Sequence, residues 1–130
     1  MKRTLLLISA ITVFAALGSA QDDAAYAGWM KTLQPNVGAA RAAITAKDNA
    51  AVAAAANKLA DTFDQILNYW TAKKVDDAVT FSKTARDAAK TLAAATDSDA
   101  QTAALRTIQG QCGGCHTAHR AGSGGSFTIK

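Results

Sequence analysis

The sequence has no glutamate, one proline, two cysteines and two histidines among 130 residues. Two cysteines are too few for a disulfide framework or a four-cysteine zinc site. The lack of glutamate excludes paired glutamates as an acid–base catalyst. No Ser/His/Asp set or phosphate-binding loop is recognisable either. The sequence therefore predicts a protein that is not an enzyme.

Alanine is abundant, with 32 copies, whereas charged residues make up only 18% of the chain. Because alanine is the best helix former and is depleted in strands, this composition favours tightly packed helices. The length suits one domain, and 49% hydrophobic residues with a net charge of +4 are typical of a folded chain. No cluster of lysine and arginine with interleaved aromatics is present, so we expect no nucleic-acid binding.

The first twenty residues, MKRTLLLISAITVFAALGSA, have the pattern of a secretory signal peptide. Lys2 and Arg3 precede an apolar stretch, and the small residues Gly18 and Ala20 suit cleavage before Gln21. The alternative is an uncleaved membrane anchor, but the stretch is shorter than the ~20 apolar residues of a spanning helix. We therefore expect a periplasmic protein whose mature form has no membrane span.

From Asp22 onward, apolar residues recur at alternating steps of four and three, the spacing of one face of an α-helix. Polar breaks near residues 47–49, 73–77 and 96–99 divide this pattern into four helices. Pro35 lies in the first helix and predicts a kink or an early turn of it.

Four amphipathic helices of similar length joined by short loops favour antiparallel neighbours. The sequence therefore predicts an all-α fold, an antiparallel up-down-up-down four-helix bundle over residues 21–120. The Gly/Ser-rich tail, residues 121–130, is expected to form a loop.

Residues 112–116 read Cys-Gly-Gly-Cys-His, the C-x-x-C-H pattern of c-type haem attachment. Two thiols one helical turn apart can each add to one haem vinyl group, which fixes the porphyrin covalently. The imidazole of His116 then serves as the fifth ligand of the iron. Export fits this interpretation, because haem is attached to such motifs outside the cytoplasm. We therefore expect one haem c, bound through Cys112 and Cys115 near the C-terminal end of the fourth helix.

Three other interpretations of the two cysteines compete. A thioredoxin-like redox motif belongs beside a strand, and no strand pattern precedes Cys112. A zinc site of Cys112, Cys115, His116 and His119 has suitable ligand types, but all four lie within about two turns of one helix. A disulfide between the two cysteines would close only a very short loop and add little stability.

The chain resembles the class II c-type cytochromes in three features. It has four predicted helices, a C-x-x-C-H motif near the end of the last helix, and a basic residue four positions after the histidine. The resemblance covers about Asp22 to Arg120 and is most specific in CGGCHTAHR. It implies that Arg120 lies beside the haem, where it is a candidate partner for a propionate. The chain departs from the family at His119, where an aromatic is common; we expect a surface histidine there. The short link at residues 73–77 is closer to the low-spin, six-coordinate relatives.

The resemblance also implies a second axial ligand. In the low-spin branch, a methionine near the start of the first helix binds iron opposite the histidine, and Met30 falls at that place. In cytochrome c′ itself the place holds an apolar residue that is not a ligand. Met30 as ordinary core packing is the alternative. Six other side chains are candidates for pocket walls or for ordinary core: Tyr26, Trp29, Leu33, Phe63, Trp70 and Phe81.

We expect a periplasmic electron carrier that exchanges single electrons with redox partner proteins, with His116 and Met30 as axial ligands. One alternative is a five-coordinate haem protein that binds nitric oxide or another small gas. Another is a helical bundle without haem. The sequence leaves open whether the bundle forms a homodimer.

Overall fold

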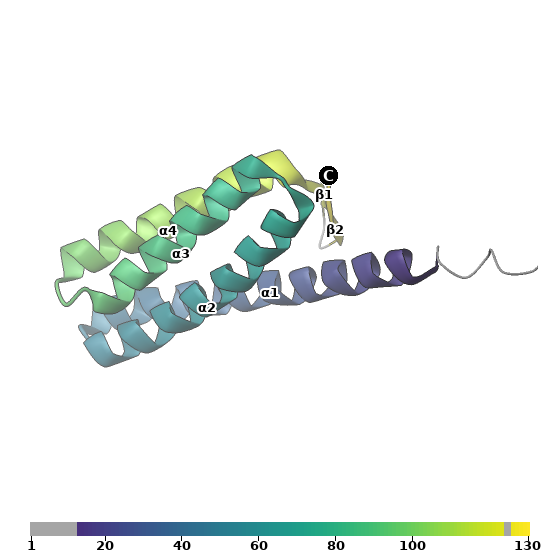
Figure 1. Ribbon diagram of the computed structural model, residues 1–130. Coiled ribbons are helices and arrows are strands. Elements are labelled where there is room, and N and C mark those ends of the chain that lie inside the picture. The colour runs from purple at the N-terminus through teal and green to yellow at the C-terminus, as the bar shows by residue number, and fades with distance from the viewer. Residues whose placement is uncertain (1–12, 124–125) are drawn as a thin grey trace, which may run out of the picture.

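The computed structural model describes residues 13–123 and 126–130, with side chains described for residues 22–123 and 128–130. The first twelve residues of the predicted signal peptide therefore lie outside the described residues. Six elements follow one another: α1 (Val13–Ala46), α2 (Asn49–Lys73), α3 (Asp76–Ala94), α4 (Ser98–His119), β1 (Arg120–Ser123) and β2 (Ser126–Ile129). The four helices pack side by side in alternating directions, which confirms the predicted four-helix bundle (Figure 1).

The three helix breaks lie where the sequence predicts them. Asp48 caps α2, since its carboxylate accepts a hydrogen bond from the Ala51 N–H at 2.9 Å. Asp97 caps α4 in the same way, accepting from the N–H groups of Asp99 and Ala100 at 3.0 and 2.9 Å. Such caps satisfy N–H groups that the first helical turn leaves without partners, so they fix where the helices begin.

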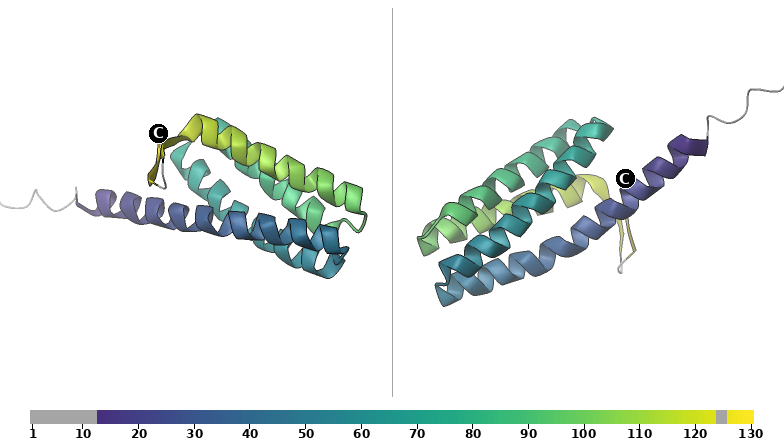
Figure 2. Two further views of the ribbon diagram at one scale, coloured as in Figure 1. Left: turned by 180° about the vertical axis from the view of Figure 1, so that it is seen from behind. Right: turned by 60° about the horizontal axis from the view of Figure 1, so that its bottom comes forward.

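The helices pack in sequence, α1 on α2, α2 on α3 and α3 on α4, and the seam between α4 and α1 closes the bundle with the sparsest contacts. Figure 2 shows α1 and α4 drawing apart toward the end of α4 that carries the two strands. The weakest seam of the bundle therefore lies at the residues of the predicted haem motif.

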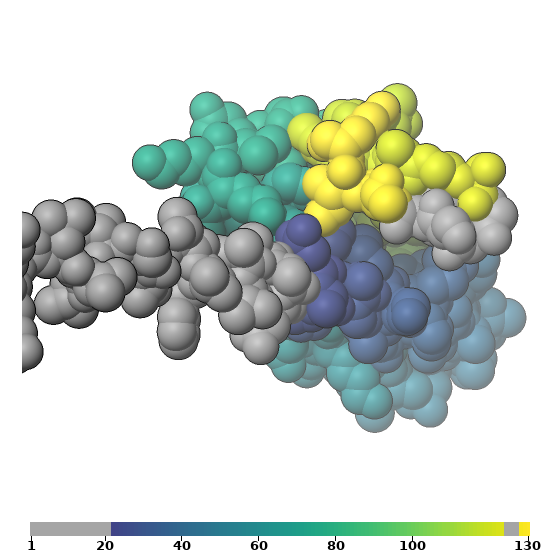
Figure 3. All heavy atoms as spheres, turned by 90° about the vertical axis from the view of Figure 1, so that its right-hand side faces the viewer, coloured from purple at the N-terminus to yellow at the C-terminus, as the bar shows by residue number. Residues whose placement is uncertain are grey.

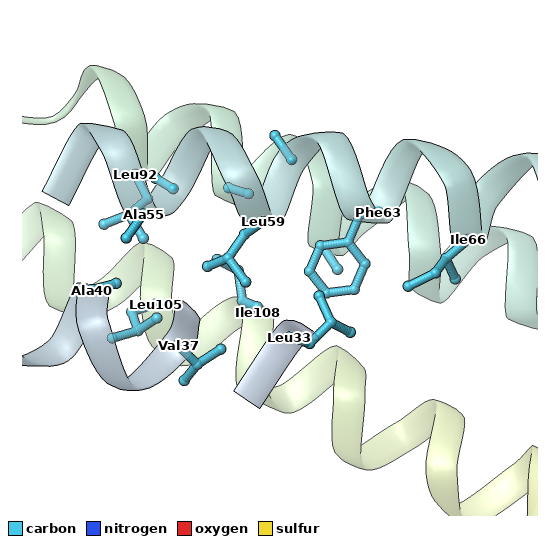
Figure 4. Packing of buried hydrophobic residues seen from close by; sticks show 14 of the residues in the cluster. Leu33, Val37, Ala40, Ala55, Leu59, Phe63, Ile66, Leu92, Leu105 and Ile108 are labelled. Carbon is cyan, nitrogen blue, oxygen red and sulfur yellow. The ribbon is translucent and has the colours of Figure 1, made fainter. Parts of the chain in front are cut away.

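Apolar side chains from all four helices meet between them (Figure 4). The largest fully buried ones are Trp70, Leu59, Ile66, Leu92 and Ile108. Between them lie small residues with no exposed surface, namely Ala40, Ala56, Ala78 and Ala89. Their size lets the helices approach closely, as the alanine-rich composition predicts.

Helix α1 begins at Val13, nine residues before the start that the apolar pattern predicts, and runs through the predicted cleavage site. Its first turns project past the end of the other helices (Figure 1). Pro35 lies in the interior of α1, and the helix continues on both sides of it. The prediction that this proline marks one of the first turns of the helix is therefore wrong. Within the described part of the chain, no helix is long and apolar enough to cross a membrane.

The tail forms a β-hairpin, so the prediction of a loop is wrong. Strands β1 and β2 are antiparallel, with Arg120 opposite Ile129 and Ala121 opposite Thr128. Gly122 has a φ of 93°, which a side chain would disfavour and glycine permits. Residues 126–129, Ser-Phe-Thr-Ile, alternate polar and apolar and include strand-favouring types. Four residues of alternation beside three glycines were too weak a signal to predict a strand.

Candidate functional site

The last two turns of α4 carry the C-x-x-C-H residues on one face. Positions three and four apart are neighbours on a helix, so Cys112, Cys115 and His116 lie together. Cys112 and His116 are half-buried and Cys115 is 9% exposed. Both cysteines are free thiols. Three groups with affinity for haem or iron therefore lie within one turn of helix.

These residues line a cavity of about 940 Å³ between α4, α1 and the hairpin. Sites for small molecules and cofactors commonly measure about 300–1,000 Å³ and have mostly apolar walls. Figure 3 looks onto this end of the molecule, where the last residues of the chain (yellow) lie next to the first described side chains of α1 (purple). The open seam between α1 and α4 thus forms a space of the size that a cofactor needs.

The structure brings all five sequence-predicted site residues to this one cavity. Cys112, Cys115 and His116 line it from α4, Arg120 from the start of β1 and Met30 from α1. Met30 of the first helix and the C-x-x-C-H side chains of the fourth thus line the same space. Of the candidate wall residues, Tyr26 and Leu33 also line this cavity.

A second, much smaller cavity of about 20 Å³ lies behind the same residues. Met30 and the C-x-x-C-H side chains line both cavities, and Phe63 and Phe81 line only the smaller one. The site residues therefore stand between the larger cavity and the apolar interior of the bundle. Trp29 and Trp70, the remaining candidates, line neither cavity and pack with other aromatic rings.

Gly114 of α4 faces the ring of Phe81 on α3. A Cβ built on Gly114 would be 2.7 Å from Cε1 of Phe81, closer than two carbon atoms can stand without a shift. A Cβ on Gly113 would meet nothing within 4 Å. Of the two glycines between the cysteines, only Gly114 is required by packing.

Burial sets the protonation of the site. It raises the pKa of the Cys112 thiol, and it raises that of Cys115 to about 11, with smaller contributions from Cys112 and Asp77. Burial also lowers the pKa of His116, and the charge of Arg120 lowers it further. The site at neutral pH thus holds protonated thiols and a neutral imidazole, and a neutral imidazole is the form that binds iron.

His119 is not the surface histidine that the sequence suggests. Its side chain is 16% exposed and lines the larger cavity. Nε2 lies 2.9 Å from Oδ2 of Asp77, and the ring lies 5.2 Å from the ring of Trp70. The imidazole therefore packs against the ring of Trp70 and pairs with a carboxylate of α3.

Tyr69 and Asp23 also support the site, and the sequence pattern did not single them out. The Tyr69 ring stacks on Tyr26 at 4.5 Å, and its hydroxyl donates a 2.6 Å hydrogen bond to Asp23. Lys73 lies 3.2 Å from the same carboxylate oxygen. These contacts join α1 to the end of α2 beside the cavity. Tyr69 lies next to Trp70 in the sequence, and this pair of aromatic residues could have indicated its burial. The spacing of apolar residues along one helix face, however, predicts burial for only one of two adjacent residues.

Comparisons of the chain with protein-family models, curated proteins and solved structures give no match.

The geometry bears on the competing interpretations of the cysteines. Among the described residues, no three His, Cys, Asp or Glu side chains are grouped so that they could hold a metal ion. Both described strands follow the motif, so the strand that a thioredoxin-like site needs before it is missing from residues 13–111. What remains is a pair of thiols, an imidazole and a thioether around one cavity.

Proposed function

We propose that this protein is a periplasmic c-type cytochrome that carries single electrons through one covalently bound haem. One observation carries the proposal. Met30 of α1 is distant in sequence from Cys112, Cys115 and His116 of α4, yet all four line one cavity of cofactor size. The C-x-x-C-H order supplies the covalent attachment and the fifth ligand together. We also infer membership of the class II c-type cytochromes from the four-helix bundle with this motif in its last helix.

Each site residue has a role that follows from its chemistry. The two thiols hold the porphyrin by thioether bonds, and the neutral imidazole of His116 binds the iron from α4. Haem bound in this way supplies an iron that alternates between ferric and ferrous states. Arg120, at the rim of the same cavity, suits a propionate because its fork of donors matches a carboxylate.

Met30 separates the proposed carrier from a gas-binding protein. It lines the cavity from the helix opposite the motif and is the only methionine left once Met1 is removed with the signal peptide. A thioether as sixth ligand raises the reduction potential and leaves no open coordination position. An open sixth position would suit nitric oxide or another small gas.

Export and processing are part of the proposal. The first turns of α1 project past the ends of the other helices, and the proposed cleavage before Gln21 falls within α1 (Figure 1). The mature protein would then exchange electrons with redox partner proteins in the periplasm. These partners would reach the haem through the cavity at the α1–α4 seam.

The test is to express the full precursor in a bacterium that attaches haem in its periplasm, and to purify the exported protein. We expect a red protein that keeps its haem through acid–acetone extraction and denaturing electrophoresis, with a low-spin spectrum in both redox states. Cys112→Ala combined with Cys115→Ala is the control and should abolish covalent attachment. Extraction of all the haem from the parent protein would overturn the proposal, and a high-spin spectrum would favour the gas-binding alternative.

A further inference from the structure

The C-terminal hairpin stands at the mouth of the larger cavity. Thr128 and Ile129 of β2 line it together with Met30 and His116. Figures 1 and 2 show the hairpin extending from the end of α4 toward α1, at the end of the bundle where these two helices draw apart. The chain end therefore supplies a wall to the part of the bundle where helix packing leaves a space.

The hairpin is held to the site by its own backbone. Strand β1 begins at Arg120, directly after α4, so no loop separates it from the haem motif. Ile129 pairs with Arg120 across the ladder, and the N–H of Lys130 donates a 3.0 Å hydrogen bond to the carbonyl oxygen of His119. These bonds hold Ile129 beside Arg120, which follows His116 by four residues, and keep its side chain at the cavity wall.

Ile129 is an apolar side chain in an exposed place. It is 36% exposed. Among residues 22–123 and 128–130, no other large hydrophobic residue is exposed to this extent. Covering an exposed apolar side chain with a second apolar surface removes both from water and lowers the free energy. Because Ile129 lies on the cavity wall, a ligand seated in the cavity is in position to provide that surface.

We propose that strand β2 is part of the haem site, with Ile129 packed against the edge of the bound porphyrin and shielding it from water. This inference rests on the proposed function, because it needs a haem in the cavity. Water stabilises the additional positive charge of ferric iron, so shielding favours the ferrous state and raises the reduction potential. Strand β2 is thus an element that tunes the potential of the haem.

The direct test is a proton NMR spectrum of the ferrous, low-spin holoprotein. A porphyrin ring shifts the resonances of methyl groups that touch it. We therefore expect the methyl resonances of Ile129 to move well away from their ordinary positions. Ile44 is the matched control, since it is a half-buried isoleucine of α1 that does not line either cavity. Its methyl resonances should stay near their ordinary positions.

Two variants test the consequence for the iron. Ile129→Ser should lower the reduction potential while covalent haem, measured after acid–acetone extraction, stays at the parent level. A chain that ends at Ala121 should lower the potential at least as much. Lys130→Arg is the control and should leave the potential unchanged, because it keeps both the positive charge and the backbone N–H that bonds to His119.

The outcomes separate this inference from the proposed function. Covalent haem with unshifted Ile129 methyl resonances and an unchanged potential in Ile129→Ser overturns the role of β2 and leaves the cytochrome proposal standing. A parent protein without covalent haem overturns both. Should the shortened chain fail to fold, the NMR spectrum and the Ile129→Ser variant still decide the question.

Discussion

The two glycines between the cysteines provide a sharp test of the packing, because they are neighbours on one helix and differ in their surroundings. We consider Gly113→Ala and Gly114→Ala, each compared with the parent protein in the same cofactor state. The Cβ added at position 113 meets open space, whereas the one at position 114 would lie 2.7 Å from Cε1 and 3.1 Å from Cζ of Phe81. The two substitutions are identical in their effect on the helix backbone and differ only in this contact.

The expected free energies follow from two opposed effects. Replacing a helical glycine with alanine stabilises a helix by about 1 kcal/mol, and this gain applies at both positions. At position 114 the ring of Phe81 must also move within the bundle, and overpacking of this kind costs about 1–3 kcal/mol. Gly113→Ala should therefore raise the free energy of unfolding by about 1 kcal/mol. Gly114→Ala should leave it unchanged or lower it by up to about 2 kcal/mol.

The measurement is denaturant unfolding followed by far-UV circular dichroism, with both variants and the parent in parallel. Phe81→Ala provides the matched background, because it removes the ring atoms that the new Cβ would meet. In that background the two alanine substitutions should have the same effect, which a double-mutant cycle detects as a coupling between positions 81 and 114. A Gly114→Ala variant as stable as Gly113→Ala in the parent background would refute the close approach of α3 and α4.

Three further predictions address the ligand, the thiols and a helix cap. Met30→Leu should convert a low-spin ferrous spectrum to a high-spin one that binds carbon monoxide; an unchanged spectrum would make Met30 packing only. In the haem-free chain, stability should fall between pH 9.0 and about 11, because the unfolded Cys115 thiol ionises before the folded one; Cys115→Ala should lessen the fall in a pH series of unfolding curves. Asp97→Ala should lower the free energy of unfolding by about 1 kcal/mol by removing the α4 cap, measured by denaturant unfolding.

The helices could be predicted from the sequence because their signals are local. An apolar residue every three or four positions decides which face is buried, and capping aspartates such as Asp48 and Asp97 mark where helices begin. The apolar residues that recur at these steps along α2, among them Leu59, Phe63 and Trp70, are buried in the structure. Periodicity therefore gave both the bundle and its core.

The surroundings of the motif could be predicted only in part. The C-x-x-C-H spacing and the place of Met30 on the first helix were enough to bring these residues together. His119 contacts Asp77 and Trp70 and so joins α4 to α3 and α2. No local sequence pattern predicts which residues of different helices lie at the same level along the bundle axis. The hairpin was missed because its glycine-rich composition outweighed four alternating residues. Interactions between distant segments, together with the C-terminal hairpin, were what the sequence left undetermined.

The Asp23 contact with Tyr69 and Lys73 has a consequence for the precursor. In the uncleaved chain, Asp22 and Asp23 lie in the third turn of α1, beyond the first turn where the helix dipole favours anions. The proposed cleavage before Gln21 would place both carboxylates in the first turn of a shorter helix, where the positive end of the dipole favours anions. Removal of the leader would then stabilise the end of α1 that borders the cavity, in addition to the contacts that Asp23 already makes with Tyr69 and Lys73.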